Sequence, residues 1–293
     1  MASVEIAATD SKTARARPFL KWVGGKGQLV PQLLPLFPQE FNNYFEPFMG
    51  SAAVFFALRD RIKSAYLSDS NEELVNTFRQ VKEHSVLFLD ALRRHRDNHS
   101  KNPKEYYYLV RSTLPGTLKP FERAARFIYL NKTCFNGLYR VNLKGHYNVP
   151  MGAYKNPGIF DPEALSAASR ALAGIDIRTS RFDDFKQREP TANDFVYFDP
   201  PYIPLNRTSN FTSYTRDAFG EAQQKELHDL CRELDKRGCF VVQSNSDTPT
   251  VRKLYSDLRP RFRIFEVNAR RAINSVASKR GAISEVVITN VPV

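Results

Sequence analysis

The chain has few cysteines and no long apolar segment. Its three cysteines, Cys134, Cys231 and Cys239, are scattered among 293 residues, so neither a disulfide framework nor a zinc site is predicted, and a reducing compartment fits. No apolar run is long enough to cross a bilayer. Residues 1–17 are polar and basic and lack the apolar region of a signal peptide, so we expect them to form a loose tail.

Acidic residues are outnumbered by basic ones. The sequence has 43 Lys and Arg against 31 Asp and Glu, which gives a formal net charge of +12 at pH 7 and a pI near 9.6. This balance favours a polyanionic partner such as a nucleic acid, although many basic proteins bind none. A hydrophobic content of 42% is ordinary, and the length can bury a full core in one large domain or two smaller ones.

The phosphate-loop pattern of nucleoside triphosphate-binding proteins is also missing, although a glycine turn is present. Tyr44-Phe45-Glu46 is typical of a short strand, and it runs into Pro47-Phe48-Met49-Gly50-Ser51. The residues from Ala52 to Arg59 then have a helical pattern. A strand, a tight glycine turn and a helix in this order are typical of the cofactor loop of a Rossmann-like unit.

A second predicted strand ends at an acidic residue. Ala65-Tyr66-Leu67 leads to Asp69, which lies 19 residues beyond Gly50. An acidic residue about 20 positions past the glycine turn is placed to accept hydrogen bonds from ribose hydroxyls. Because a triphosphate loop is missing, we expect an adenosyl ligand held by Glu46 or Asp69. Capping of the helix that starts near Asn71 would explain Asp69 about equally well.

Glycines and charges also gather near the N-terminus. Phe19-Leu20-Lys21-Trp22-Val23-Gly24-Gly25-Lys26 combines paired glycines with two lysines and the only tryptophan. Such glycines let a backbone approach a ligand closely, while the ring supplies a stacking surface. A simple turn explains this stretch about as well.

The most informative stretch is Phe198-Asp199-Pro200-Pro201-Tyr202. The run before it, Asp194-Phe195-Val196-Tyr197-Phe198, has the length and composition of a buried strand. Two prolines end that strand, because proline lacks an N–H and has a fixed φ. We expect the turn to hold the Asp199 carboxylate, the Pro200 carbonyl and the Tyr202 ring beyond the edge of a sheet. Ligands of open α/β sheets bind at this carboxyl edge.

These acceptors suit a substrate with an exocyclic amino group, and the ring suits a flat partner. The amine of adenine is a poor nucleophile because its lone pair is conjugated into the ring. Acceptors that hold its hydrogens favour the pyramidal geometry in which it attacks. A surface turn is the simpler explanation of Asp-Pro-Pro alone, but the strand before it and the aromatic residue after it favour a site.

The middle of the chain differs in character. A helical pattern runs from Glu72 to about Arg96, and an apolar helix is predicted from Phe121 to Leu130. Residues 131–150 then read as a long polar loop in which Asn, Lys, Arg and aromatic residues alternate. Asn and Arg read base edges, and aromatic rings stack on bases or wedge between them. We therefore predict a DNA-reading module over residues 72–157, with a structural Asn-rich hairpin as the alternative.

The last third of the chain contains further strands and two polar segments. Residues 205–220, which include Asn210-Phe211-Thr212-Ser213-Tyr214, are predicted to form a mobile lid. A helix is predicted at 221–237 and strands at 239–243, 263–267 and 285–289, the last two as a closing pair. Arg270-Arg271-Ala272-Ile273-Asn274 and Lys279-Arg280 form a basic segment that suits phosphate contact, or a merely solvated loop.

Together these motifs closely resemble the bacterial DNA adenine-N6 methyltransferases of the D12 class, in particular the GATC-methylating Dam type. The likeness runs from about Phe19 to Asp247. The segments that carry it are Phe19-Leu20-Lys21-Trp22-Val23-Gly24-Gly25-Lys26, Glu46-Pro47-Phe48-Met49-Gly50, Leu67-Ser68-Asp69-Ser70-Asn71, Phe135-Asn136-Gly137-Leu138-Tyr139-Arg140, Asn148-Val149-Pro150 and Asp199-Pro200-Pro201-Tyr202. One departure is Ala52, which stands where the family often has a second glycine.

The resemblance implies an α/β fold with a Rossmann-like methyltransferase sheet, formed by residues 1–71 and 158–293, and a mainly helical target-recognition insert at 72–157. It implies S-adenosylmethionine as methyl donor, double-stranded DNA as partner, no metal, a monomer and a cytoplasmic location. The donor pocket would be lined by Trp22, Lys26, Glu46, Phe48, Gly50, Asp69 and Asp199. The recognition site would be contacted by Lys21, Phe135, Asn136, Leu138, Arg140 and Pro150. Catalysis would depend on Asp199, Pro200, Pro201 and Tyr202.

The resemblance also implies a mechanism. The target adenine would flip out of the duplex, Phe135 would enter the base stack, and N6 would attack the methyl group directly. No cysteine is preceded by proline, so the thiolate mechanism of cytosine C5 methylation is not expected. Methylation of cytosine N4, an RNA target and an inactive DNA-binding relative are the alternatives.

Overall fold

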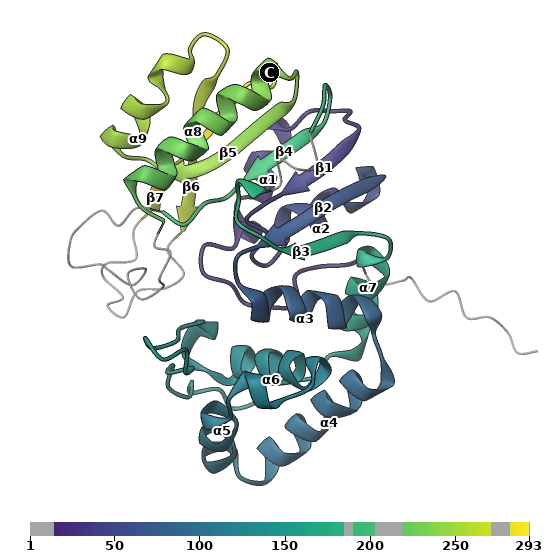
Figure 1. Ribbon diagram of the computed structural model, residues 1–293. Coiled ribbons are helices and arrows are strands. Elements are labelled where there is room, and N and C mark those ends of the chain that lie inside the picture. Colours follow the sequence, from purple (N-terminus) through teal and green to yellow (C-terminus); the bar gives the residue numbers. More distant parts are fainter. Residues whose placement is uncertain (1–14, 185–189, 203–218, 271–281, 293) are drawn as a thin grey trace, which may run out of the picture.

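The computed structural model describes residues 15–184, 190–202, 219–270 and 282–292. Within these ranges, one seven-stranded sheet has the order β3-β2-β1-β4-β5-β7-β6 (Figure 1). The parallel strands are β1 (Asn43–Glu46), β2 (Ser64–Asp69), β3 (Asp176–Thr179), β4 (Phe195–Phe198) and β5 (Phe240–Ser246). β7 (Ala282–Thr289) runs antiparallel to β5 and to β6 (Arg263–Arg270), which confirms the predicted closing pair.

Some predicted segments lie outside the described residues. These are residues 1–14 of the tail, positions 205–218 of the proposed lid with Asn210-Phe211-Thr212-Ser213-Tyr214, and positions 271–281 of the basic segment. Arg270, the first residue of that basic segment, is the last residue of β6.

Helices cover both faces of the sheet, and the composition of the central strand shows why. Phe195 and Tyr197 of β4 belong to one hydrophobic cluster, whereas Val196 and Phe198 belong to another on the opposite face. A parallel strand buried on both faces is apolar along its whole length. The first cluster is completed by α1 (Val30–Leu33), α2 (Ala53–Leu58), α3 (Glu72–Glu83) and α7 (Pro162–Leu172), and the second by α8 (Glu221–Lys236) and α9 (Pro249–Leu254).

The helical pattern predicted over residues 72–96 corresponds to two helices, α3 and α4 (Val86–Lys101), with a break between them. His84, in the left-handed conformation with φ 51°, ends α3. Ser85 then begins α4, and its side chain accepts a hydrogen bond from the backbone N–H of Phe88 at 3.3 Å. The apolar periodicity continues across the break, so only the local cap marks it. The helix α7 and the strand β3 were not predicted either.

The remaining helices, α4, α5 (Pro103–Ser112) and α6 (Pro120–Thr133), lie together on the far side of α3 from the sheet (Figure 1). They are not separated from the sheet by a break in the core. Phe78 of α3, Phe88 of α4 and Ile128 of α6 share one cluster with Leu67 of β2. The position of the domain boundary near residue 72 therefore stays a prediction.

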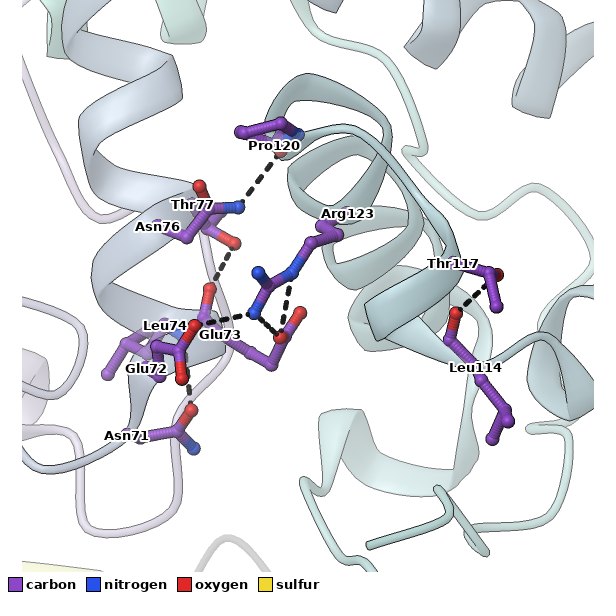
Figure 2. Close-up of polar contacts among 10 residues, drawn as sticks. All are labelled: Asn71, Glu72, Glu73, Leu74, Asn76, Thr77, Leu114, Thr117, Pro120 and Arg123. Atoms are coloured by element: carbon purple, nitrogen blue, oxygen red, sulfur yellow. Dashed lines mark hydrogen bonds and ion pairs between the residues drawn. The ribbon is translucent and has the colours of Figure 1, made fainter.

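Polar contacts also join α3 to α6. Arg123 of α6 pairs with Glu72 at 2.9 Å and with Glu73, and the side chain of Asn76 donates to the carbonyl of Pro120 at 2.9 Å (Figure 2). Because α3 follows directly after Asp69 and Asn71, these contacts fix the helical part relative to the carboxyl edge of the sheet.

Candidate active site

The strand order reverses between β1 and β4, and the carboxyl ends of both strands carry an acid. Glu46 is the last residue of β1, and Asp199 follows directly after β4. Ligands of open α/β sheets bind at such a switch point. Asp69 ends the neighbouring strand β2, so the three carboxylates predicted from the sequence lie along one edge.

Asp199 is paired with a buried lysine. The ammonium nitrogen of Lys26 lies 2.6 Å from Oδ1 of Asp199, and it also donates to the carbonyl of Gly24 at 2.9 Å. The same nitrogen lies 4.9 Å from the centre of the Tyr202 ring. Burial raises the pKa of Asp199 to about 6, even though Lys26 opposes the shift. Asp199 is therefore largely ionised at neutral pH while remaining a moderately basic group.

Glu285 of β7 completes this cluster and was missed by the sequence analysis. Its Oε2 accepts a hydrogen bond from the Tyr202 hydroxyl at 2.6 Å and lies 3.8 Å from the Lys26 ammonium. Because β7 is antiparallel, its N-terminal end lies at the carboxyl edge of the parallel strands, where Glu285 pairs in register with Ser246 of β5. A lone acid at the start of the predicted strand 285–289 was the available signal.

Glu46 is buried and carries a proton at neutral pH. Its Oε2 accepts a hydrogen bond from the Tyr44 hydroxyl at 2.9 Å. Burial, with a smaller contribution from the charge of Asp199, raises the pKa of Glu46 to about 8, against the opposing effect of the Tyr44 hydrogen bond. A cationic or hydroxyl-bearing ligand beside Glu46 would favour its charged form.

Asp69 holds the glycine turn rather than a helix. Its Oδ2 accepts the backbone N–H of Gly50 at 3.1 Å, and its Oδ1 accepts that of Asn71 at 2.9 Å. The cap of α3 is Asn71, whose side chain accepts the N–H of Leu74 at 3.1 Å. The alternative interpretation of Asp69 as the helix cap is therefore wrong. Burial raises the pKa of the Asp69 carboxyl above its usual value.

The turn itself requires a glycine at position 50. Gly50 has a φ of +47°, and a Cβ there would lie 2.8 Å from Cδ1 of Trp22. Ala52 also adopts a left-handed conformation, with φ 54° and ψ 36°, directly before α2. Such a conformation costs an ordinary residue about 1–2 kcal/mol. The turn thus forms with alanine at the position where the family often has glycine.

Aromatic residues surround this turn. The ring of Trp22 stacks with Phe127 of α6 at 6.2 Å and with Tyr139 at 6.1 Å between ring centres. Phe48 stacks on Phe182 at 5.3 Å. Phe182 was not among the predicted site residues. Trp22 therefore links the glycine turn to the helical part, and Phe48 adds an apolar wall.

The predicted interface residues gather where α6 ends. The side chain of Asn131 accepts from the backbone N–H of Lys21 at 2.9 Å and donates to the carbonyls of Lys21 and Gly137 at 2.7 and 3.1 Å. Phe135 follows, with 45% of its surface exposed, and its backbone N–H donates to the carbonyl of Pro150 at 2.9 Å. Asn136 has a left-handed φ of 55°.

The polar loop beyond them is a hairpin. Val141 and Tyr147 form an antiparallel bridge, and the Tyr147 hydroxyl donates to the carbonyl of Leu138 at 2.6 Å. Nε of Arg140 donates to Oδ1 of Asn148 at 2.7 Å. The shape agrees with the hairpin alternative, and all six predicted contact residues lie on this segment or beside it. They are Lys21, Phe135, Asn136, Leu138, Arg140 and Pro150.

Neither a membrane-spanning helix nor a metal site is found within residues 15–184, 190–202, 219–270 and 282–292. No helix in these ranges is long and apolar enough to cross a membrane. No three His, Cys, Asp or Glu residues in the same ranges gather as metal ligands would.

Comparisons with known proteins agree with the chemistry predicted for Asp199 and the Pro200 carbonyl, which suit a substrate with an exocyclic amino group. A family model described as D12 class N6 adenine-specific DNA methyltransferase matches residues 22–273. A type II methyltransferase, M1.LlaDCHI of Lactococcus lactis subsp. cremoris, is 43% identical over 94% of this chain and 95% of its own length. The type II methyltransferase M.MjaIII of Methanocaldococcus jannaschii is 41% identical, with 94% and 99% covered. A DNA adenine methylase of Escherichia coli (strain K12) is 34% identical, with 92% and 93% covered.

Solved structures are more distant. A SAM-dependent methyltransferase from Agrobacterium tumefaciens is 11% identical, with a TM-score of 0.39 over 90% of this chain and 59% of that one. A likeness at this level supports no argument about function.

Proposed function

The chain belongs to the D12 class of N6 adenine-specific DNA methyltransferases, and from this premise we propose how its residues methylate adenine in DNA. We propose that S-adenosylmethionine is the donor, that the target is a flipped adenine in duplex DNA, within GATC as in the Dam type, and that the enzyme acts as a cytoplasmic monomer. The observation that carries the proposal is the position of Asp199, which lies with Lys26 and Glu285 at the switch point of the sheet.

The residues at this edge fit the methyl donor. S-adenosylmethionine combines ribose hydroxyls, an amino group and a sulfonium, which carboxylates attract, with a carboxylate that suits Lys26. Asp69 and Glu46 lie at the ends of adjacent strands, where they would bind the hydroxyl and cationic groups. Glu46, with its pKa near 8, would lose its proton to solvent when such a ligand binds beside it. Trp22, Phe48 and the turn at Gly50 would supply the apolar walls.

The target base would be held by the corner after β4. Asp199 and the Pro200 carbonyl would accept the two hydrogens of the amine, and the Tyr202 ring would stack on the base. When bound, S-adenosylmethionine would supply a sulfonium methyl group, and the N6 lone pair would form the new N–C bond as the C–S bond breaks. With a pKa near 6, Asp199 is basic enough to accept the proton that the methylated amine then loses.

Recognition would come from the hairpin and the end of α6. Flipping the adenine costs about a few kcal/mol, which Phe135 would help to offset by entering the base stack. Arg140 would contact a guanine, which is worth about 1–3 kcal/mol of discrimination. Asn148 holds the guanidinium of Arg140 in one orientation and so reduces its freedom before DNA binds. Lys21, Asn136, Leu138 and Pro150 would make the remaining contacts.

The test is to map the methylated product. The purified chain is incubated with plasmid DNA and labelled donor, and the DNA is digested to nucleosides and sequenced for modified positions. We expect label in N6-methyladenine at GATC. Label in N4-methylcytosine, transfer to RNA alone, or adenine methylation at unrelated sequences would each contradict part of the proposal.

A further inference from the structure

The geometry points to a role for Glu285 that deepens the proposed function and depends on it. We propose that Glu285 is a positioning residue for methyl transfer, which fixes the Tyr202 ring and gives Lys26 a second anionic partner. Asp199 is then free to grip the target amine.

Glu285 is placed by a rigid element. It lies in β7, between Ser246 of β5 and Val267 of β6 in the register of the sheet. Its side chain is only 12% exposed. The backbone of a strand with a ladder on each side moves little, so its carboxylate is a fixed point at the edge of the site.

The first contact of this carboxylate orients the Tyr202 ring. The two prolines before Tyr202 restrict the backbone that leads to it, but they leave the side-chain torsions of Tyr202 free. The hydroxyl reaches Oε2 of Glu285 at 2.6 Å, which is the length of a strong hydrogen bond to a charged acceptor. Fixing both ends of the side chain fixes the plane of the ring, and that plane determines how a flipped base stacks.

The second contact concerns the ammonium of Lys26. In this structure it lies 2.6 Å from Oδ1 of Asp199, an oxygen that the target amine needs. Only 4% of Lys26 is exposed, so losing its partner would leave a buried charge uncompensated. Glu285 lies 3.8 Å from the same nitrogen, so a small movement transfers the ion pair from Asp199 to Glu285. The lysine keeps an anionic partner throughout.

The charge of Glu285 also acts on Asp199 through space. The groups that face Asp199 are Lys26 before α1, Glu285 of β7, Glu46 and Tyr44 of β1, Tyr197 of β4 and Tyr202. Glu285 contributes to the raised pKa of Asp199, after burial, while Lys26 opposes the rise. Neutralising Glu285 should therefore lower that pKa and move the acid limb of the activity profile to lower pH.

The test compares Glu285→Gln, Tyr202→Phe and the double variant in steady-state methylation of a GATC duplex. Glu285→Gln keeps the shape of the side chain but removes its charge, and Tyr202→Phe keeps the ring but removes the hydroxyl. Glu266→Gln is the matched control, because Glu266 is a largely exposed acid on the neighbouring strand β6. Thermal unfolding and donor binding of each variant show whether it is folded.

We expect Glu285→Gln to lower kcat by at least about 10-fold, which is the loss that one charge-assisted hydrogen bond represents, with a smaller change in KM. The kcat of the double variant should fall by less than the product of the fold-losses in the two single variants. The acid limb should move to lower pH in Glu285→Gln and stay in place in Tyr202→Phe and Glu266→Gln.

An unchanged kcat in Glu285→Gln would overturn the positioning role. It would also be overturned if the loss of kcat in the double variant equals the product of the two single losses and the acid limb of Glu285→Gln stays in place. If the unmodified chain itself methylates no adenine, the proposed function fails instead, and the two failures are distinguishable.

Discussion

At the scale of single residues, we expect methyl transfer to depend on the charge of Asp199. The amine is held by an ionised carboxylate, so turnover should rise as the pH rises through the pKa of Asp199 near 6. A cationic donor bound nearby lowers that pKa, so the midpoint for kcat should lie at or below the midpoint for kcat/KM measured against the donor. Rates of methyl transfer between pH 5 and 8 check this expectation. A pH-independent rate over that range would contradict it.

Glu46 gives a prediction about stability. Its folded pKa near 8 lies above the usual value of 4.5, so its favourable effect on stability is complete below pH 4.5 and is lost as the pH rises through 8. Glu46→Gln should therefore raise the free energy of unfolding of the ligand-free chain at pH 8, by about 1–3 kcal/mol, and change it little at pH 4.5.

The same substitution should weaken donor binding at pH 8, where Glu46 can become charged beside the donor and the amide cannot, and should change it less at pH 4.5, where Glu46 is protonated. Urea unfolding and donor titration at the two pH values measure these effects. Equal stability of both proteins at pH 8 would show that Glu46 is not protonated in the free chain.

Single residues also show what a sequence can reveal. Glu46, Asp69 and Asp199 were predictable because each follows an apolar strand, and parallel strands bring their carboxyl ends together. Glu285 was not predictable, because its position depends on how β7 enters the sheet, antiparallel and between β5 and β6. Local sequence patterns do not encode the register of that pairing. The pairing of Lys26 with Asp199 likewise joins segments far apart in the chain.

At the scale of elements, the turn between β1 and α2 is the sensitive part. Gly50→Ala forces a side chain into a φ of +47° and against Trp22, so we expect a loss of about 1–3 kcal/mol in stability and a clear loss of donor affinity. Gly116→Ala is the matched control, because a Cβ there meets nothing within 4 Å. Thermal unfolding, together with titration followed by the fluorescence of the single tryptophan, measures both effects. A Gly50→Ala protein that binds the donor normally would contradict the role of the turn.

The elements that the sequence revealed are those with a strong local signal. The strand 194–198, the helix ending before Gly238 and the closing strands were recognised from apolar runs bounded by breakers. The break at His84 was missed because the apolar spacing of α3 continues into α4. The polar loop after α6 was predicted as a DNA-reading loop or a structural hairpin. In the structure, its Tyr147 and Val149 pack in one cluster with Tyr107 of α5 and Tyr129 of α6.

At the scale of the whole molecule, affinity for DNA and choice of sequence should be separable. The net charge of +12 supplies contacts with phosphates that do not depend on sequence, so duplex affinity should fall steeply with added salt. Arg140→Ala should reduce the preference for the target site by about 1–3 kcal/mol while changing the affinity for unrelated duplexes much less. Competition binding at two salt concentrations measures both quantities. An unchanged preference would remove Arg140 from the recognition surface.

The role of Asp199 is tested by methyl incorporation into plasmid adenine by Asp199→Ala, measured beside the unmodified chain and with duplex binding followed on the same sample. We expect incorporation to fall to background while the variant stays folded and binds duplex DNA nearly as well. Incorporation near the unmodified rate would contradict the assignment of the corner after β4 as the place where the amine is held.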